Sequence, residues 1–183
     1  MQDPAAPTER KATFEEFEAY AEARDGRFEF DDGAILDMGI PSDAHADLSL
    51  ALAKALDPHL RARGCKVRLA GRLVTVRGER VPKKERSPDA VVICDGKPRK
   101  LVCEILSPNR GDDLGKKRAE YEAMREFDEY LVIDSLARWV RVYWRNDEDV
   151  FVYDVDHIAG SVALRSIEFV LDIDALYREA GVP

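Results

Sequence analysis

Branched apolar residues concentrate in two short segments near the middle of the chain, residues 89–94 and 100–106. Each segment has the length and composition of a β-strand, and Asp95-Gly96 between them is a hairpin-turn signal. Alternation along the two strands leaves both faces of this hairpin apolar. Such two-sided burial indicates a sheet that is covered by helices on both sides.

Two acids interrupt this apolar pattern. With the turn centred near residues 96 and 97, Asp89 lies opposite Glu104 across the hairpin. Acids are almost never fully buried unless they are paired, and like charges opposite each other on neighbouring strands repel. A cation between them, either a divalent metal or a nearby lysine, would explain the pair. The alternative is that both acids lie at frayed strand ends and point into water.

Helical and strand periodicities alternate through the rest of the chain. They predict helices over residues 13–24, 42–63 and 112–126, a last helix from Asp172 or Asp174 to Arg178, and strands over 27–30, 34–38, 65–69, 73–76, 129–134, 139–144 and 151–153. The strand at 129–134 follows the helix behind the hairpin, which is the parallel crossover arrangement. We therefore expect an α/β (α+β) fold in which helices flank a mixed central sheet, with an N-terminal helix-hairpin and a C-terminal antiparallel meander.

Two further expectations concern the segment before the central hairpin. The strands at 65–69 and 73–76 are separated only by Ala70-Gly71-Arg72, so their alternation predicts that they pair with each other. Residues 78–87 are rich in charge and have the composition of a mobile loop.

The composition limits the class of protein. At 183 residues the chain fits one domain, which we place at residues 12–183 after a disordered tail at residues 1–11. No run of about 18 uncharged apolar residues is present, so we expect no membrane span, and the first residues lack an apolar signal core, so we expect a cytoplasmic protein. Cys65, Cys94 and Cys103 lack metal-ligand spacing and are expected to be small core residues.

Charge is distributed unevenly along the chain. The formal net charge of -8 argues against a large electrostatic footprint for nucleic acid. Residues 61–86 are nevertheless strongly basic, and such asymmetry can mark a surface that faces phosphates. The candidate nucleic-acid contacts in this region are Arg77, Lys83, Lys84 and Arg86. The alternative is a solvated charged loop.

The order of the elements and the position of the two acids resemble the core of the PD-(D/E)XK nucleases. Pro88-Asp89, followed fifteen residues later by Glu104, matches the acidic half of that motif. More closely, the chain resembles the Uma family of putative restriction endonucleases, a prokaryotic group that shares this restriction-endonuclease-like core. The resemblance spans most of residues 13–145. Its most specific part is the run of Pro88-Asp89, Glu104-Ile105-Leu106-Ser107-Pro108, Asp113, Lys117, Tyr121, Glu129 and Tyr130.

The resemblance implies metal-dependent hydrolysis of phosphodiester bonds in DNA. Asp89, Glu104 and the carbonyl of Ile105 would hold Mg²⁺ or Mn²⁺, because hard cations prefer oxygen ligands. The general nuclease motif has a lysine two residues after the glutamate, where this chain has Leu106. In the Uma-like pattern the lysine lies on the following helix, and Lys117 matches it. Lys117 would orient the attacking water or stabilise the developing charge.

Three further residues are candidates for accessory roles. Glu29 is a third acid for the site or, alternatively, an exposed strand residue. His45 lies in the first turn of a predicted helix, where a lone histidine is more often a surface or capping residue than a catalyst. Tyr121 is one helical turn from Lys117 and either supports it, contacts phosphate or packs in the core.

Three hypotheses about function follow. The first is an endonuclease acting on DNA as a homodimer, whose two sites cut the two strands. The second is a catalytically inactive protein that keeps the nuclease fold for binding or oligomerisation, which the net charge and Leu106 favour. The third is metal-dependent hydrolysis of a small phosphoester, which would not need the basic stretch at 61–86.

Overall fold

The computed structural model describes residues 11–76, 82–106 and 113–183. Most of the predicted tail at residues 1–11 therefore lies outside the described residues. The chain divides into two compact units, and each is discontinuous in sequence. Unit 1 comprises residues 1–40 and 72–87, and unit 2 comprises residues 41–71 and 88–183. The expectation of a single domain stays a prediction.

Unit 1 combines a short helix with a four-stranded antiparallel sheet in the order β2-β1-β5-β4. Its elements are α1 (Phe14–Glu22), β1 (Phe28–Asp31), β2 (Ala34–Asp37), β4 (Leu73–Val76) and β5 (Pro82–Arg86). A capping box begins α1, because the side chain of Thr13 accepts from the backbone of Glu16 and the Glu16 side chain accepts from the backbone of Thr13. Phe17 packs its ring on Phe30, which fixes α1 against β1.

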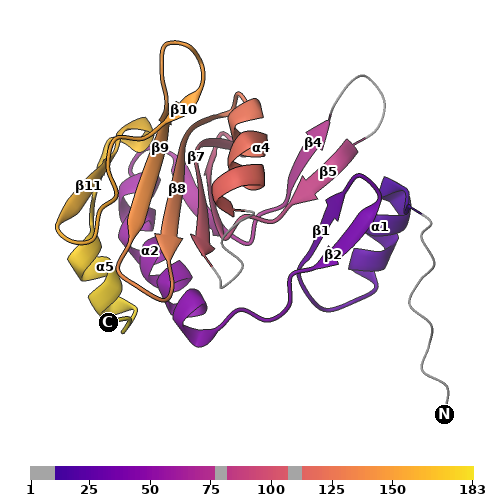
Figure 1. Cartoon of the computed structure of the whole chain (residues 1–183), viewed down its shortest axis with the longest axis horizontal. Coiled ribbons are helices and arrows are strands. Elements are labelled where there is room, and N and C mark those ends of the chain that lie inside the picture. The colour runs from indigo at the N-terminus through magenta and orange to yellow at the C-terminus, as the bar shows by residue number, and fades with distance from the viewer. Residues whose placement is uncertain (1–10, 77–81, 107–112) are drawn as a thin grey trace. The chain divides into compact units, whose positions relative to one another are not determined.

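Unit 2 is built on a six-stranded mixed sheet in the order β10-β9-β8-β7-β6-β3 (Figure 1). The strands are β3 (Cys65–Leu69), β6 (Ala90–Cys94), β7 (Lys97–Leu106), β8 (Phe127–Asp134), β9 (Val140–Arg145) and β10 (Phe151–Val152). The neighbours β7 and β8 run parallel, as the crossover argument predicted, and the other pairs are antiparallel. The mixed central sheet is therefore confirmed, and the antiparallel strands β9 and β10 form one of its edges.

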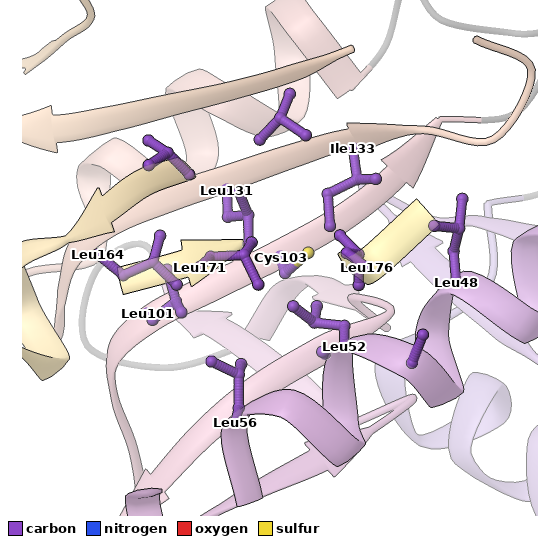
Figure 2. Packing of buried hydrophobic residues seen from close by; sticks show 14 of the residues in the cluster. Leu48, Leu52, Leu56, Leu101, Cys103, Leu131, Ile133, Leu164, Leu171 and Leu176 are labelled. Carbon is purple, nitrogen blue, oxygen red and sulfur yellow. The ribbon is translucent and has the colours of Figure 1, made fainter. Parts of the chain in front are cut away.

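One face of this sheet carries the main hydrophobic core. Helix α2 (Asp43–Arg61) and helix α5 (Ile173–Glu179) cover it, together with the small sheet of β11 (Ser161–Leu164) and β12 (Phe169–Asp172). Figure 2 shows Leu52 of α2, Leu176 of α5 and Cys103 of β7 among the side chains of this core. Burying one such leucine stabilises the fold by about 1.5–3 kcal/mol, so this layer holds unit 2 together.

The opposite face of the sheet is covered by the segment that connects β7 with β8. Its described part is a π-helical turn, η1 (Asp113–Lys117), followed by α4 (Arg118–Ala123). Tyr121 of α4 is fully buried and packs its ring against Tyr130 of β8. The sheet is therefore covered on both sides, as the two apolar faces of the hairpin predicted.

The segment before the central hairpin differs from the prediction. Residues 65–69 and 73–76 do not pair: β3 pairs with β6 in unit 2, whereas β4 pairs with β5 in unit 1. Ala70 turns the chain with a positive φ of 48°, and its N–H donates to the carbonyl of Asp89 (3.0 Å). Gly71 lies so close to Val91 that a Cβ atom would meet its side chain at 2.6 Å. These contacts hold the chain where it leaves unit 2.

Two other expectations are corrected. Residues 82–86 of the expected charged loop form the strand β5, while residues 77–81 lie outside the described part. Cys65 and Cys94 are directly opposite each other in the β3–β6 ladder and form a disulfide, so they are not simple core residues. Cys103 is a free, buried thiol, as expected of a small core residue.

Among the helices that the structure describes, none combines the length and the apolar character that crossing a membrane requires.

Candidate active site

The two acids of the central hairpin are both buried. Ala90 pairs with Cys103, and this register places Asp89 opposite Glu104, as predicted. Asp89 is 5% exposed and Glu104 is 3% exposed. The interpretation that they lie at frayed strand ends and point into water is therefore wrong.

The register at this end of the hairpin depends on an irregularity. The turn itself lies at Asp95-Gly96, where both residues have positive φ, as a type I′ turn requires. Cys94 therefore pairs with Lys97, one position earlier than the turn centre predicted from sequence. The register shifts between Val91 and Ile93, and this shift restores the expected pairing beside the acids.

The carboxylate of Asp89 is held by two donors. Its Oδ2 accepts from the backbone N–H of Ile105 (2.7 Å) and contacts Nε2 of His45 (3.0 Å). His45 lies in the first turn of α2, where its own backbone N–H donates to the N-cap hydroxyl of Ser42 (3.3 Å). The histidine is buried, so its interpretation as a surface residue is wrong. Its Nδ1 makes no hydrogen bond within the described residues.

The carboxylate of Glu104 is held by two donors from η1 and α4. Its Oε1 accepts from Nζ of Lys117 (3.2 Å) and from the hydroxyl of Tyr121 (2.6 Å). Lys117 ends the π-helical turn, and π-helical turns occur frequently at functional sites. The lysine that the sequence places on the helix therefore reaches the acid. Tyr121 both packs in the core and supports Glu104.

The thiol of Cys103 lies in the electrostatic field of both acids. Burial raises the pKa of its thiol well above the usual range, and repulsion from the carboxylates of Asp89 and Glu104 raises it further. Both carboxylates therefore act on the same sulfur atom. Their negative charge is concentrated at one point of the sheet.

The donor set suits a hard divalent cation. No group of three or more His, Cys, Asp or Glu side chains within the described ranges is arranged to hold a metal ion. Mg²⁺ does not require such a group, because it usually keeps several waters and binds through one or two carboxylates and a substrate phosphate. Two buried carboxylates on neighbouring strands, with the backbone carbonyl of Ile105 beside them in sequence, fit that requirement.

Glu29 belongs to unit 1, where it is buried. Its carboxylate accepts from the backbone N–H of Ser87 (3.1 Å) and pairs with Arg86 (3.5 Å). The interpretation of Glu29 as an exposed strand residue is therefore wrong. Its accessory role at the site stays a prediction.

The predicted nucleic-acid contacts have mixed outcomes. Arg86 is 2% exposed and forms ion pairs with Glu29 and with Asp31, so it is an internal residue of unit 1 and not a surface cation. Lys84 pairs with Asp31 (3.1 Å). Arg77 and the side chain of Lys83 lie outside the described part of the chain.

Comparison with known proteins identifies the family. The model of the Uma2 family, described as "Putative restriction endonuclease", matches residues 14–172. The chain belongs to the Uma2 family. The match includes most of both units, and it confirms the resemblance inferred from the acids and the helix that follows them.

Two proteins similar to this Uma2 protein extend the comparison. It is 26% identical over 185 residues to the uncharacterized protein slr1290 of Synechocystis, across 96% of this chain and 95% of the relative. Its fold is similar to a crystal structure of a putative nuclease from Anabaena variabilis, with a TM-score of 0.69. That similarity covers 90% of this chain and 98% of the other at 17% identity, so it establishes the fold alone.

Sequence reasoning gave too little weight to one residue of this Uma2 site. In the sequence His45 stands alone near a helix start, a position typical of a surface or capping residue. A usable signal was its place on the third residue of a helix whose apolar positions face the same sheet as Asp89. The hydrogen bond from Ile105 to Asp89 had no sequence signal, because it involves a backbone donor.

Proposed function

We propose that this Uma2 protein is a metal-dependent endonuclease that hydrolyses phosphodiester bonds in DNA with the PD-(D/E)XK arrangement of residues. The observation that carries the proposal is the pair of buried carboxylates in opposing register, with a lysine on one of them. Burying two like charges on neighbouring strands is unfavourable unless a cation compensates them. Lys117 compensates one charge, and a divalent cation compensates the remainder.

Asp89, Glu104 and the backbone carbonyl of Ile105 are the residues that would hold Mg²⁺ or Mn²⁺. When bound, the metal lowers the pKa of a coordinated water and neutralises charge on the phosphate. Site residues must be held in position by other contacts to be effective. The bonds from Ile105 and His45 to Asp89, and from Tyr121 to Glu104, supply that support.

Lys117 supplies the positive charge that phosphoryl transfer requires. Its Nζ lies 3.2 Å from Glu104 and is largely buried, so its charge is weakly screened by water. A fixed cation beside the scissile phosphate stabilises the charge that develops on the phosphate oxygens. Removing a comparable fixed donor typically slows an enzyme by about 10²–10³.

Leu106 occupies the position of the usual motif lysine, and its packing bears on the inactive alternative. Its side chain is buried and apolar, so this position has no catalytic role. The ion pair between Lys117 and Glu104 places a lysine at the acid from the neighbouring helix instead. A lysine at a different position can therefore take the role of the usual motif lysine. This supports an active enzyme over an inactive protein that has kept the fold.

Concerted cleavage of both strands of a duplex uses two sites, and a homodimer with two-fold symmetry provides them. We propose a homodimer on this basis. Sedimentation velocity should give the mass of two chains. A chain that cuts both strands of a duplex while it sediments as a monomer would contradict the dimer and not the nuclease.

The decisive experiment combines metal binding and cleavage. Binding of Mg²⁺ and Mn²⁺ is measured by calorimetry on the wild type, Asp89→Asn and Glu104→Gln, and nicking of plasmid DNA is measured on the same samples. Glu129→Gln serves as the control, because Glu129 is a buried acid of the same sheet that bonds to Arg165 and Ser166 instead of the site.

We expect metal binding and nicking to be lost together in both site variants and kept in the control. Metal binding without cleavage of any DNA substrate would favour the inactive alternative. Cleavage of a small phosphodiester in preference to plasmid would favour the third hypothesis. The absence of metal binding that depends on Asp89 and Glu104 would overturn the proposal.

A further inference from the structure

The strand register links the candidate site to an arginine two strands away on the same face of the sheet. Glu104 of β7 pairs with Val132 of β8, and Val132 pairs with Arg141 of β9. Cross-strand partners project their side chains from the same face of a sheet. Arg141 therefore lies on the face that carries Glu104. Two strand spacings separate their backbones, which is about 10 Å.

Arg141 is surrounded by aromatic rings and is partly open to solvent. Its guanidinium carbon lies 3.9 Å from the ring centre of Tyr153, 4.9 Å from that of Trp139 and 5.7 Å from that of Tyr143. Two of its nitrogens donate to the two carboxylate oxygens of Asp156 (2.6 and 2.8 Å). The side chain of Arg141 is 17% exposed and that of Asp156 is 35% exposed.

A second arginine joins this cluster to the site. Arg118 follows Lys117 directly at the start of α4, and its guanidinium lies 5.9 Å from the ring centre of Tyr143. It pairs with Glu122 on the same helix (2.7 Å). Tyr143 therefore has Arg118 and Arg141 as neighbours. Its ring also lies 5.2 Å from that of Tyr153, so these four side chains form one contiguous row.

The side chains in this row match the chemistry of a nucleic-acid strand. Arginine binds phosphate with the same bidentate geometry that it uses for carboxylate. Exposed aromatic rings bind bases by stacking. Tyr153 is 46% exposed at the end of the row. The row beside the candidate site therefore offers cations for the phosphates of a nucleic-acid strand and an aromatic ring for one of its bases.

We propose that Arg118, Arg141 and Tyr153 form a binding strip for the nucleic-acid strand next to the acid pair. The proposal rests on the proposed function and specifies how that site holds its substrate. The two arginines exchange their carboxylate partners, Glu122 and Asp156, for phosphates when the strand binds. A phosphate offers each arginine the same bidentate acceptor geometry as a carboxylate, so the exchange replaces one charge-assisted pair with another.

Binding without cleavage tests the strip. The probes are fluorescein-labelled duplex and single-stranded DNA 20-mers, and their anisotropy is measured with Ca²⁺ in place of Mg²⁺. The variants are Arg118→Gln, Arg141→Gln and Tyr153→Ala. The control is Arg63→Gln, an arginine that is also ion-paired to an acid, Glu168 (3.3 Å). It follows the far end of α2, roughly 27 Å from His45 at 1.5 Å per residue.

We expect Arg141→Gln to weaken DNA binding by at least tenfold, and Arg118→Gln to weaken it in the same direction. The slope of log affinity against log salt for the duplex should fall by about 0.9 for each phosphate contact that is lost. Tyr153→Ala should weaken single-stranded binding without changing the salt slope, because stacking carries no charge. The control should stay within twofold of the wild type.

The outcomes separate this inference from the proposed function. Strip variants that bind DNA as tightly as the wild type, with an unchanged salt slope, would overturn the strip even if cleavage is observed. Calorimetry with Mg²⁺ should give wild-type affinity for all three strip variants. A loss of Mg²⁺ affinity would show that the substitutions disturb the acid site, and it would also overturn the strip as a separate binding element.

Discussion

Glu104 receives two donors on a single carboxylate oxygen, and this arrangement restricts its movement. The Lys117 ammonium and the Tyr121 hydroxyl both reach Oε1 from the same helical segment, four residues apart. A charge-assisted hydrogen bond is roughly twice as strong as a neutral one. The acid is therefore held in one orientation before any ligand binds, which reduces the cost of assembling the site.

The first prediction separates the role of Lys117 from that of a ligand. In Lys117→Met, cleavage should fall by about 10² or more, because a fixed positive charge is removed from the site. Mg²⁺ affinity should stay equal or increase, because the lysine competes with the metal for Glu104. Calorimetry and single-turnover cleavage on the same sample measure the two quantities.

A surface lysine provides the control for this prediction. Lys54 pairs with Glu179 (2.7 Å) where both side chains are more than half exposed, so Lys54→Met should change neither quantity. Mg²⁺ affinity and cleavage that decline in parallel in Lys117→Met would show that the lysine shapes the metal site itself.

The second prediction concerns Glu129, whose pKa is raised from its ordinary value near 4.5 because burial penalises the charged form. Hydrogen bonds from Ser166 and Arg165 offset part of this effect. Because the folded pKa exceeds the unfolded one, the folded state binds the proton more tightly. The contribution of Glu129 to stability is therefore fully present below pH 4.5 and is lost as pH rises through the folded pKa, which lies above 4.5.

Glu129→Gln removes this titration. The difference in unfolding free energy between wild type and variant should shift in favour of the variant between pH 4 and pH 7, as measured by urea denaturation. Glutamine can still accept from the backbone N–H groups, which limits the loss at every pH. A difference that is constant across this range would contradict the raised pKa.

At the scale of elements, sequence periodicity predicted which residues form strands better than which strands pair. Alternation identified the central hairpin and both of its faces, because a strand that is buried on both sides has apolar residues at successive positions of the sequence. It failed for residues 65–76, because alternation says nothing about the partner of a strand. The chain passes from one sheet to the other at Ala70 and Gly71. Short turns of this kind also join strands that pair with each other, so the turn does not distinguish the two cases.

The candidate site was predictable in part for the same reason. The positions of Asp89, Glu104 and Lys117 follow from strand register and helix order, which are local features. The charged run that contains Arg86 predicts a surface position for it, because such runs usually face solvent. Its burial depends on acids more than 50 positions away in sequence, and no local pattern reports such a pair.

The third prediction concerns the disulfide that joins β3 to β6. Cys65 and Cys94 close a loop with a sequence separation of 29 residues. By the chain-entropy model, a loop of that size stabilises the folded state by about 3–4 kcal/mol. Guanidinium denaturation with and without dithiothreitol should show a difference of this order in the wild type.

The variant Cys65→Ser/Cys94→Ala controls for the effect of the reductant itself. Its stability should match the reduced wild type to within about 1 kcal/mol and should not respond to dithiothreitol. Equal stability of the oxidised and reduced wild type would show that the disulfide does not constrain the unfolded chain as this model assumes.

At the scale of the whole molecule, a bound metal should be visible as stability. A ligand that binds only the folded state adds about 2.7 kcal/mol at a concentration of 100 Kd. The fourth prediction is that Mg²⁺ raises the Tm of the wild type in a concentration-dependent way. EDTA should reverse this shift.

Asp89→Asn should show no Mg²⁺-dependent shift in Tm, whereas Glu129→Gln should shift as the wild type does. Equal shifts in wild type and Asp89→Asn would mean that the stabilising metal binds elsewhere on the protein. Differential scanning calorimetry measures both, and also reports whether the two units unfold in one transition or in two.

The chain leaves unit 2 after Gly71 and returns to it at Pro88, and the bond from Ala70 to Asp89 ties these two points together. During synthesis, the β1–β2 hairpin therefore emerges well before β5, the strand that completes its sheet. Roughly 50 residues separate them, which takes about 3–10 s at 5–20 residues per second. For that time the nascent chain carries an unpaired strand edge, so its yield in the cell should depend on chaperones that shield such edges.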